Sequence, residues 1–137
     1  MEGVLQSFLA GFPTLILHFS ITIALLAIGV TIYIFLTPIK EIALIRQNNS
    51  AAAVSFGGAT VALAIPLASA MSSSVNAADI MVFGAVALIL QLFCDKAAVI
   101  LLRDLHGRIA KGEVAASILL VSIKLGVSAI NAAALSV

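Results

Sequence analysis

The sequence predicts an all-α integral membrane protein with four transmembrane helices, arranged as two tandem two-helix hairpins. Of its 137 residues, 63% are hydrophobic and only 9% are charged, whereas soluble domains average about 25% charged residues. The mean hydropathy is +1.25. Four apolar stretches are each long enough to cross about 30 Å of hydrocarbon at about 1.5 Å per residue. We therefore expect one membrane domain over residues 1–137, in contact with the lipid bilayer.

The four spans follow one another with short connections. They are predicted at Leu15–Leu36, Ala51–Met71, Ile80–Leu102 and Val114–Leu135. The first pair makes a hairpin unit over residues 15–72 and the second pair a unit over 80–136. Between the first two spans, Pro38 suits the first position of a short helix lying in the membrane interface. Asn49 or Ser50 then suits the cap of the second span.

The basic residues outside the spans predict the orientation. They lie in the first and third connections: Lys40, Arg46, Arg103, Arg108 and Lys111. The second connection and the terminal segments contain no lysine or arginine. Because positively charged loops stay in the cytoplasm, both termini are predicted to be periplasmic. The net charge of +1 and the lack of a basic run argue against a nucleic-acid partner.

The two halves of the chain are similar just before their second spans. "IALIRQNNSAAAV" precedes the second span and "HGRIAKGEVAASI" precedes the fourth. The stretch from Ile45 to Ala52-Ala53 matches that from Ile109 to Ala115-Ala116 with one residue fewer. Two repeats of two spans each have the same orientation in the membrane. We therefore expect two hairpins related by an axis along the membrane normal.

Small and polar side chains recur at helical spacing along one side of each span. Close packing between membrane helices explains most of the serine, threonine and glycine positions, and Gly57 and Gly58 are predicted to serve it. Pro66 lies in mid-span and should kink its helix. Such a kink is either structural or part of the frame of a transport site.

Charged residues inside the predicted spans need a separate explanation. Asp95 and Lys96 are adjacent in "LILQLFCDKAAVILL", and Lys124 lies in the fourth span. Each charge costs about 2.5–3.5 kcal/mol near the bilayer midplane on insertion scales. Counting at 1.5 Å per residue puts Asp95 roughly 10 Å and Lys124 roughly 15 Å from the cytoplasmic ends of their spans. We expect these two side chains to pair.

Other polar residues extend this predicted contact. Gln91 shares a helix face with Asp95, and Ser128 and Asn131 share one with Lys124. Lys96 points about 100° away from Asp95, so it is expected to reach the cytoplasmic headgroups or an acid of another subunit. His18 can titrate near neutral pH, but its place near the outer end of a span favours an interfacial side chain.

The sequence carries no recognisable catalytic or ligand motif. It has no HExxH, no GxSxG, no phosphate-binding loop and no cysteine or histidine cluster at metal-ligand spacing. Asp95 is the only acid well inside a span, whereas catalysis there needs a pair of acids or a nucleophile with its base. We therefore expect neither an enzyme nor a cofactor or metal site.

Several runs resemble a known family. They are "LTPIKEIALIRQNNSAAAVSFGGATVALAIPLASA", "FGAVALILQL" and "GEVAASILLVSIKLGVSAINAAA". Across Leu36–Ala134 the chain is similar to the domain-of-unknown-function 350 family, small YjfL-like bacterial inner-membrane proteins. The resemblance implies two tandem two-helix units, an inner-membrane location and partner proteins of an envelope-stress or membrane-maintenance system. It implies no established activity. Phe83 stands where the family usually has tryptophan, and Asp95, Lys96 and Lys124 stand where apolar or small residues are expected.

Two functional hypotheses follow. In the first, the protein is a homo-oligomeric channel-like or transport component for an ion or small cation. The path would then be lined by Gln91, Asp95, Lys124, Ser128 and Asn131. In the alternative, it is a non-conducting scaffold whose connections Thr37–Ser50 and Arg103–Glu113 bind partners.

Overall fold

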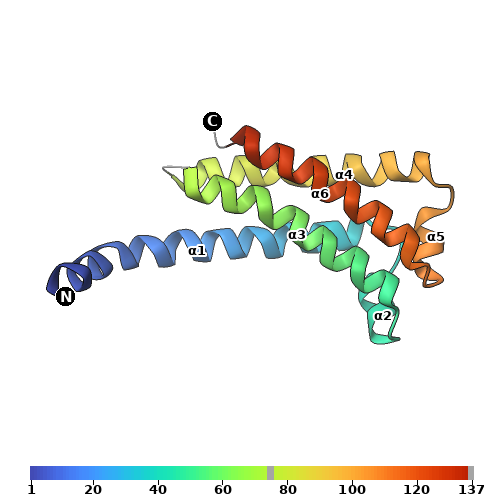
Figure 1. Ribbon diagram of the computed structural model, residues 1–137, viewed down its shortest axis with the longest axis horizontal. Coiled ribbons are helices and arrows are strands. Elements are labelled where there is room, and N and C mark those ends of the chain that lie inside the picture. The colour runs from blue at the N-terminus through green and yellow to red at the C-terminus, as the bar shows by residue number, and fades with distance from the viewer. Residues whose placement is uncertain (74–75, 136–137) are drawn as a thin grey trace.

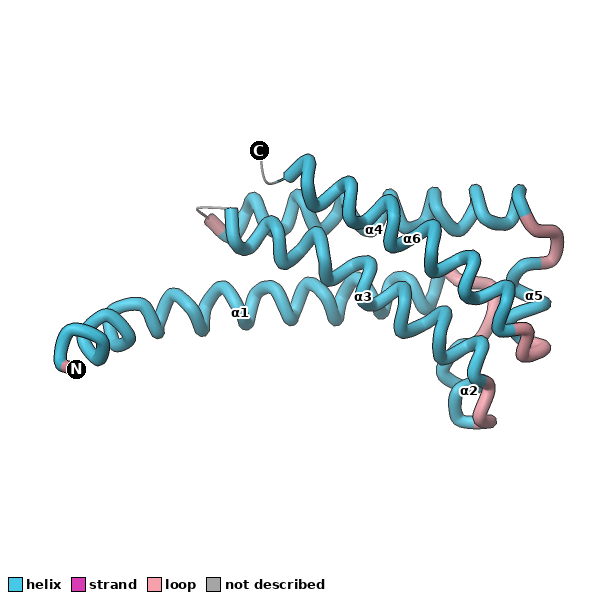
Figure 2. The backbone as a smooth tube through the Cα atoms, in the orientation of Figure 1, coloured by secondary structure: helices cyan, strands magenta, loops and turns pink. Residues whose placement is uncertain are grey.

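The computed structural model describes residues 1–73 and 76–135, which form six α-helices and no strand (Figures 1 and 2). In chain order the helices are α1 (Glu2–Leu36), α2 (Glu41–Arg46), α3 (Ser50–Ser73), α4 (Ala77–Leu101), α5 (Leu105–Ala110) and α6 (Val114–Leu135). Among the described residues, α1, α3, α4 and α6 are long and apolar enough to cross a membrane. The all-helical class with four candidate spans is thereby confirmed. Residue 136, the predicted end of the second unit, lies outside the described residues.

The first helix begins earlier than predicted. α1 starts at Glu2, not Leu15, and continues through Pro13 over 35 residues, about 52 Å at 1.5 Å per residue. A proline removes one backbone hydrogen bond, but the flanking turns keep theirs, and membrane helices tolerate this. Figure 1 shows the N-terminal part of α1 curving away from the other helices and extending past them.

Pro38 ends one helix and does not begin the next. Thr37 has an extended backbone, with φ −79° and ψ 134°, which is the conformation that a following proline favours. Its N–H donates to the Tyr33 carbonyl at 2.9 Å and closes α1. α2 then starts at Glu41. The prediction that Pro38 takes the first position of the short helix is therefore wrong. Residues 37–40 instead form the connection that turns the chain from α1 back toward α3.

The centre of the bundle is the contact between α3 and α6, with α4 packed on both and α1 on α3 and α4. Small side chains allow this close approach. A Cβ added at Gly58 would overlap the Val121 side chain of α6. At Gly57 it would meet nothing within 4 Å, so the close contact within the chain lies at Gly58, and a packing role for Gly57 stays a prediction. Pro66 is buried inside α3, which stays helical on both sides.

The turns after α2 and α5 have the same backbone hydrogen bonds. Asn48 and Gly112 both have positive φ, 64° and 90°, and each donates to the carbonyl three residues earlier at 2.9 Å. The residue after each donates five residues back at 3.0 Å, a standard way to end a helix. The two turns align Ile45 with Ile109 without a gap, so the one-residue difference predicted there is wrong.

Asn49 connects the two turns. Its Oδ1 accepts from the Ala52 N–H at 3.0 Å, which caps α3. Its Nδ2 donates to the carbonyls of Ile109 and Ala110 at 3.3 and 3.0 Å. Of the two caps that the sequence offered, Asn49 is therefore the one used. Around it lies a buried apolar cluster of Ala51, Ala52, Ala98, Leu105, Ile109, Ala116 and Leu120.

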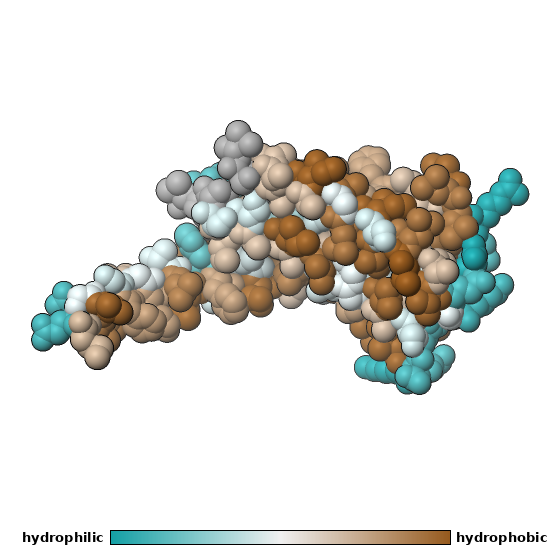
Figure 3. Space-filling view, in the orientation of Figure 1, coloured by the Kyte–Doolittle hydropathy of each residue, from teal (hydrophilic) through white to brown (hydrophobic). Residues whose placement is uncertain are grey.

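Hydrophilic side chains gather at one end of the molecule, over α2 and α5, and at the N-terminal tip of α1 (Figure 3). Apolar side chains cover much of the surface between them. α2 and α5 lie together at the end of the bundle opposite the N-terminus and the end of α6 (Figure 1). The basic residues of the first and third connections therefore share one end, as their spacing predicted.

Candidate functional site

Lys124 and Asp95 form an ion pair inside the bundle. The Lys124 Nζ lies 2.9 Å from the Asp95 Oδ1, although this oxygen is not aligned as a hydrogen-bond acceptor. The lysine is fully buried and the aspartate is 8% exposed. The contact predicted from the sequence is thus present, between α6 and α4. Opposite charges at this distance offset part of each other's desolvation.

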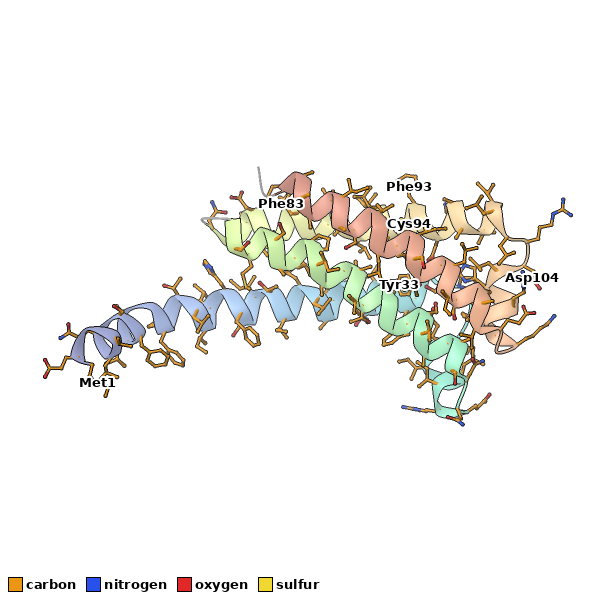
Figure 4. The ribbon with its side chains drawn as sticks, in the orientation of Figure 1. Met1, Tyr33, Phe83, Phe93, Cys94 and Asp104 are labelled. Carbon is orange, nitrogen blue, oxygen red and sulfur yellow. The ribbon has the colours of Figure 1, made fainter. Side chains whose placement is uncertain are left out.

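Tyr33 of α1 is the second partner of this lysine. The Lys124 Nζ donates to the Tyr33 hydroxyl and lies 4.1 Å from the centre of its ring, where the ring quadrupole attracts a cation. Figure 4 places Tyr33 on the stretch of α1 that passes behind α3 and α6. Sequence reasoning did not identify Tyr33 as a partner of Lys124.

Glu41 of α2 completes the cluster, and sequence reasoning missed it. Its side chain is 2% exposed, and neither carboxylate oxygen has a hydrogen-bond partner among the described residues. Burial raises the pKa of Glu41 to about 7, with the nearby Lys124 opposing the shift and Asp95 adding to it. In the sequence it falls within the short helix that is expected to lie in the membrane interface, which gives no sign of burial.

Polar atoms continue from the ion pair toward the other end of the bundle. Ser128 donates to the Ala62 carbonyl at 2.6 Å, and Gln91 Nε2 donates to the Lys124 carbonyl at 3.5 Å. Gln91 Oε1 and Asn131 Nδ2 have no partner within the described part of the chain. Asn131 lies seven residues beyond Lys124, about 10 Å along α6. These side chains form a polar column, defined here as Asn131, Ser128, Gln91, Lys124 and Asp95.

Two cavities border the charged cluster. One of about 530 Å³ is lined by Asp95, Lys96 and His106 together with apolar residues of α1 and α4. Another of about 520 Å³ is lined by Glu41 and its neighbours on α2 and at the end of α1. The two buried acids therefore line different cavities. Burial lowers the pKa of His106, while Asp95 acts in the opposite direction.

The remaining predicted residues lie apart from this cluster. Lys96 is exposed. His18 is half-buried on α1, fifteen residues before Tyr33 and so about 22 Å away along the helix. Arg108 pairs with Glu113 at 2.5 Å. The other basic residues of the connections are exposed: Lys40, Arg46, Arg103 and Lys111. Within residues 1–73 and 76–135, no group of acidic, histidine or cysteine side chains is placed to hold a metal ion.

Comparison with known proteins supplies a family and two relatives. The family model for Domain of Unknown Function (DUF350) matches residues 7–135. The chain is 31% identical over 119 residues to "UPF0719 inner membrane protein YjfL" of Escherichia coli strain K12, covering 87% of this chain and 90% of the relative. The protein of the same name from Escherichia coli O157:H7 matches equally. No solved structure matches the chain.

Proposed function

The chain belongs to the DUF350 family and is a multi-pass inner-membrane protein, and from this starting point we propose that it is a channel-like or transport component for a small cation. The observation that carries the proposal is the buried Lys124–Asp95 pair at the end of the polar column, next to a cavity of about 530 Å³. Ionisable side chains within membrane helices are rare and usually belong to ion or proton pathways.

The energetics of the pair support this interpretation. A buried ion pair contributes little to stability, since well-packed apolar residues of similar volume stabilise a fold equally well or better. Structural packing alone therefore gives no reason for a lysine with 0% exposure in the middle of α6. An ion pathway gives such a reason, because a passing ion needs charged groups to which it can bind.

The polar column supplies the rest of the path. Its partnerless atoms, Gln91 Oε1 and Asn131 Nδ2, offer hydrogen-bonding capacity that the described residues leave unused. In the proposed mechanism, a cation reaches Asp95 from the cavity beside it and competes with Lys124 for that carboxylate. The polar groups of Gln91, Ser128 and Asn131 then replace the lost hydration along the column.

The proposed arrangement in the membrane follows the positive charges. We infer two hairpins, each a span, a short helix and a second span, with the basic end in the cytoplasm and both termini in the periplasm. The identical turns after α2 and α5 support a duplication. We also infer a homo-oligomer, in which helices of neighbouring copies pack through small residues. The proposed role is not enzymatic.

Flux into liposomes that contain the purified protein tests the proposal. We expect cation flux above that of empty liposomes, and its loss in Asp95→Asn and in Lys124→Met. Asp79→Asn on the exposed first turn of α4 and Lys111→Met in a connection are matched controls that should keep the flux. Flux no higher than in empty liposomes would contradict the proposal, and unchanged flux in both core variants would remove the ion pair from the path.

The alternative is a non-conducting scaffold, and the exposed basic side chains at the α2 and α5 end favour it. Lys40 and Arg46 on one side and Arg103 and Lys111 on the other are free to contact an acidic partner, for instance one of a membrane-stress system. This hypothesis predicts that reversing these charges abolishes co-purification of a partner. The core variants Asp95→Asn and Lys124→Met would leave such co-purification intact.

A further inference from the structure

Glu41 is a buried acid to which the surrounding fold offers no hydrogen bond. It is 2% exposed, and both of its oxygens lack a partner among the described residues. Burying an ionised carboxylate in this way is so costly that such groups normally pair or take up a proton. Glu41 therefore needs a positive charge or a proton that neutralises it.

The fold itself does not require an acid at this place. Glu41 lies four residues before Ile45, and Leu105 lies four residues before Ile109, at the matching point of the second, identically hydrogen-bonded turn. Leu105 is completely buried. The same short helix is thus built with an apolar side chain in one half of the protein and with a carboxyl group in the other.

The charged groups around Glu41 leave one negative charge uncompensated. Lys124 of α6 and Asp95 of α4 both act electrostatically on Glu41, and Glu41 acts on Tyr33 of α1. The sequence of α3, the helix against which α2 packs, contains no ionisable residue. On α2 and its cap, Arg46 and Lys40 are exposed. His106 of α5 interacts with Asp95 and Lys124. One buried ammonium thus acts electrostatically on two buried acids.

We propose that Glu41 is a proton-binding site, and that its proton decides how Lys124 is shared. With the proton bound, Glu41 is neutral and Lys124 pairs with Asp95 as observed. When the Glu41 O–H bond breaks, the proton leaves through the cavity of about 520 Å³ that Glu41 lines. The carboxylate then competes with Asp95 for the ammonium. No other bond changes.

Proton release at Glu41 would affect the other cavity, which Asp95 lines. As Lys124 turns toward Glu41, it no longer neutralises the negative charge of Asp95 at the wall of the cavity of about 530 Å³, where a small cation can bind. This coupling of proton release to cation uptake rests on the proposed function, whereas the proton site itself does not. The pKa of Glu41, raised mainly by burial to about 7, puts the exchange in the physiological range.

A carboxyl titration tests the site directly. The sequence contains only three glutamates, Glu2, Glu41 and Glu113, so protein labelled with ¹³C at the glutamate carboxyl gives three NMR signals in detergent micelles. Glu2→Gln and Glu113→Gln assign the other two. We expect one midpoint near 7, which disappears in Glu41→Gln. Three midpoints in the acid range would overturn the proposal.

The sharing of Lys124 is tested with Asp95→Asn in the same labelled protein. Lys124 then has one acid to neutralise, so the Glu41 midpoint should fall toward the acid range, while Asp79→Asn should leave it unchanged. A midpoint that stays near 7 in Asp95→Asn would refute the sharing. If a variant fails to fold, the titration of the unchanged chain still decides the proton site. A near-neutral Glu41 in a protein without cation flux would contradict the proposed function alone.

Discussion

Lys124 of α6 binds Tyr33 of α1 through both its hydroxyl group and the face of its ring. The two residues are 91 positions apart, and α1 otherwise packs on α3 and α4. One lysine thus connects the first span to the last, while its ion pair with Asp95 holds the third. The packing of three of the four spans and the charge of the site therefore depend on the same ammonium group.

Replacing Tyr33 should separate the contributions of its hydroxyl group and its ring to the contact with Lys124. Tyr33→Phe keeps the ring face but loses the hydroxyl that accepts from Lys124, so we expect a loss of about 1 kcal/mol. Tyr33→Leu loses the ring as well and should cost about 1 kcal/mol more. Thermal unfolding in detergent, followed by circular dichroism, measures both. Equal melting temperatures for the two variants would exclude a contribution from the ring.

Glu41→Leu should stabilise the protein. The change removes a buried carboxyl group without hydrogen bonds and introduces the side chain that occupies the matching position, Leu105. We expect a gain of about 1–3 kcal/mol, the usual penalty for a buried polar group left without a partner. Glu113→Leu is the control, since it breaks only an exposed ion pair worth at most about 1 kcal/mol. A lower melting temperature for Glu41→Leu would mean that the carboxyl group stabilises the fold.

Stability should depend on pH through Glu41. Its pKa is about 7 in the folded protein and 4.5 as the ordinary value, so the folded state binds more protons between these values. The free energy of unfolding should therefore fall as pH rises from 4.5 to 7, by about 3 kcal/mol, and then level off.

His106 acts in the opposite direction over part of this range. Burial lowers its pKa, so the folded state binds fewer protons there and stability rises with pH up to its ordinary value of 6.5. Glu41→Gln keeps His106 and removes the other group. The difference between the unchanged chain and this variant, measured across pH, isolates Glu41. A difference that does not vary with pH would contradict the predicted slope.

Gly58 and Gly57 offer a matched pair for the contact between α3 and α6. Gly58→Ala places a methyl group on the Val121 side chain, and such overpacking costs about 1–3 kcal/mol. Gly57→Ala meets nothing within 4 Å and should stabilise the helix by up to about 1 kcal/mol. Melting temperatures that shift in opposite directions are the expected result. A stable Gly58→Ala would show that α6 can move away from α3.

Composition and spacing were enough to predict the four spans and the pairing of Asp95 with Lys124. Few charges occur in such a chain, so two opposite charges at similar depth have few other partners. Glu41 could not be found in this way, because its burial depends on how Pro38 redirects the chain and how α2 then docks on α3. Gly57 and Gly58 are neighbours in sequence, and only the rotation of α3 about its axis decides which one meets α6.

The buried lysine also affects how the protein is made. α6 is the last of the described helices to leave the ribosome, and on its own it would carry an ammonium group into hydrocarbon at a cost of about 2.5–3.5 kcal/mol. The groups that neutralise this charge, Asp95 and Tyr33, belong to helices that are synthesised earlier. Entry of α6 into the bilayer is therefore coupled to its docking against helices already there.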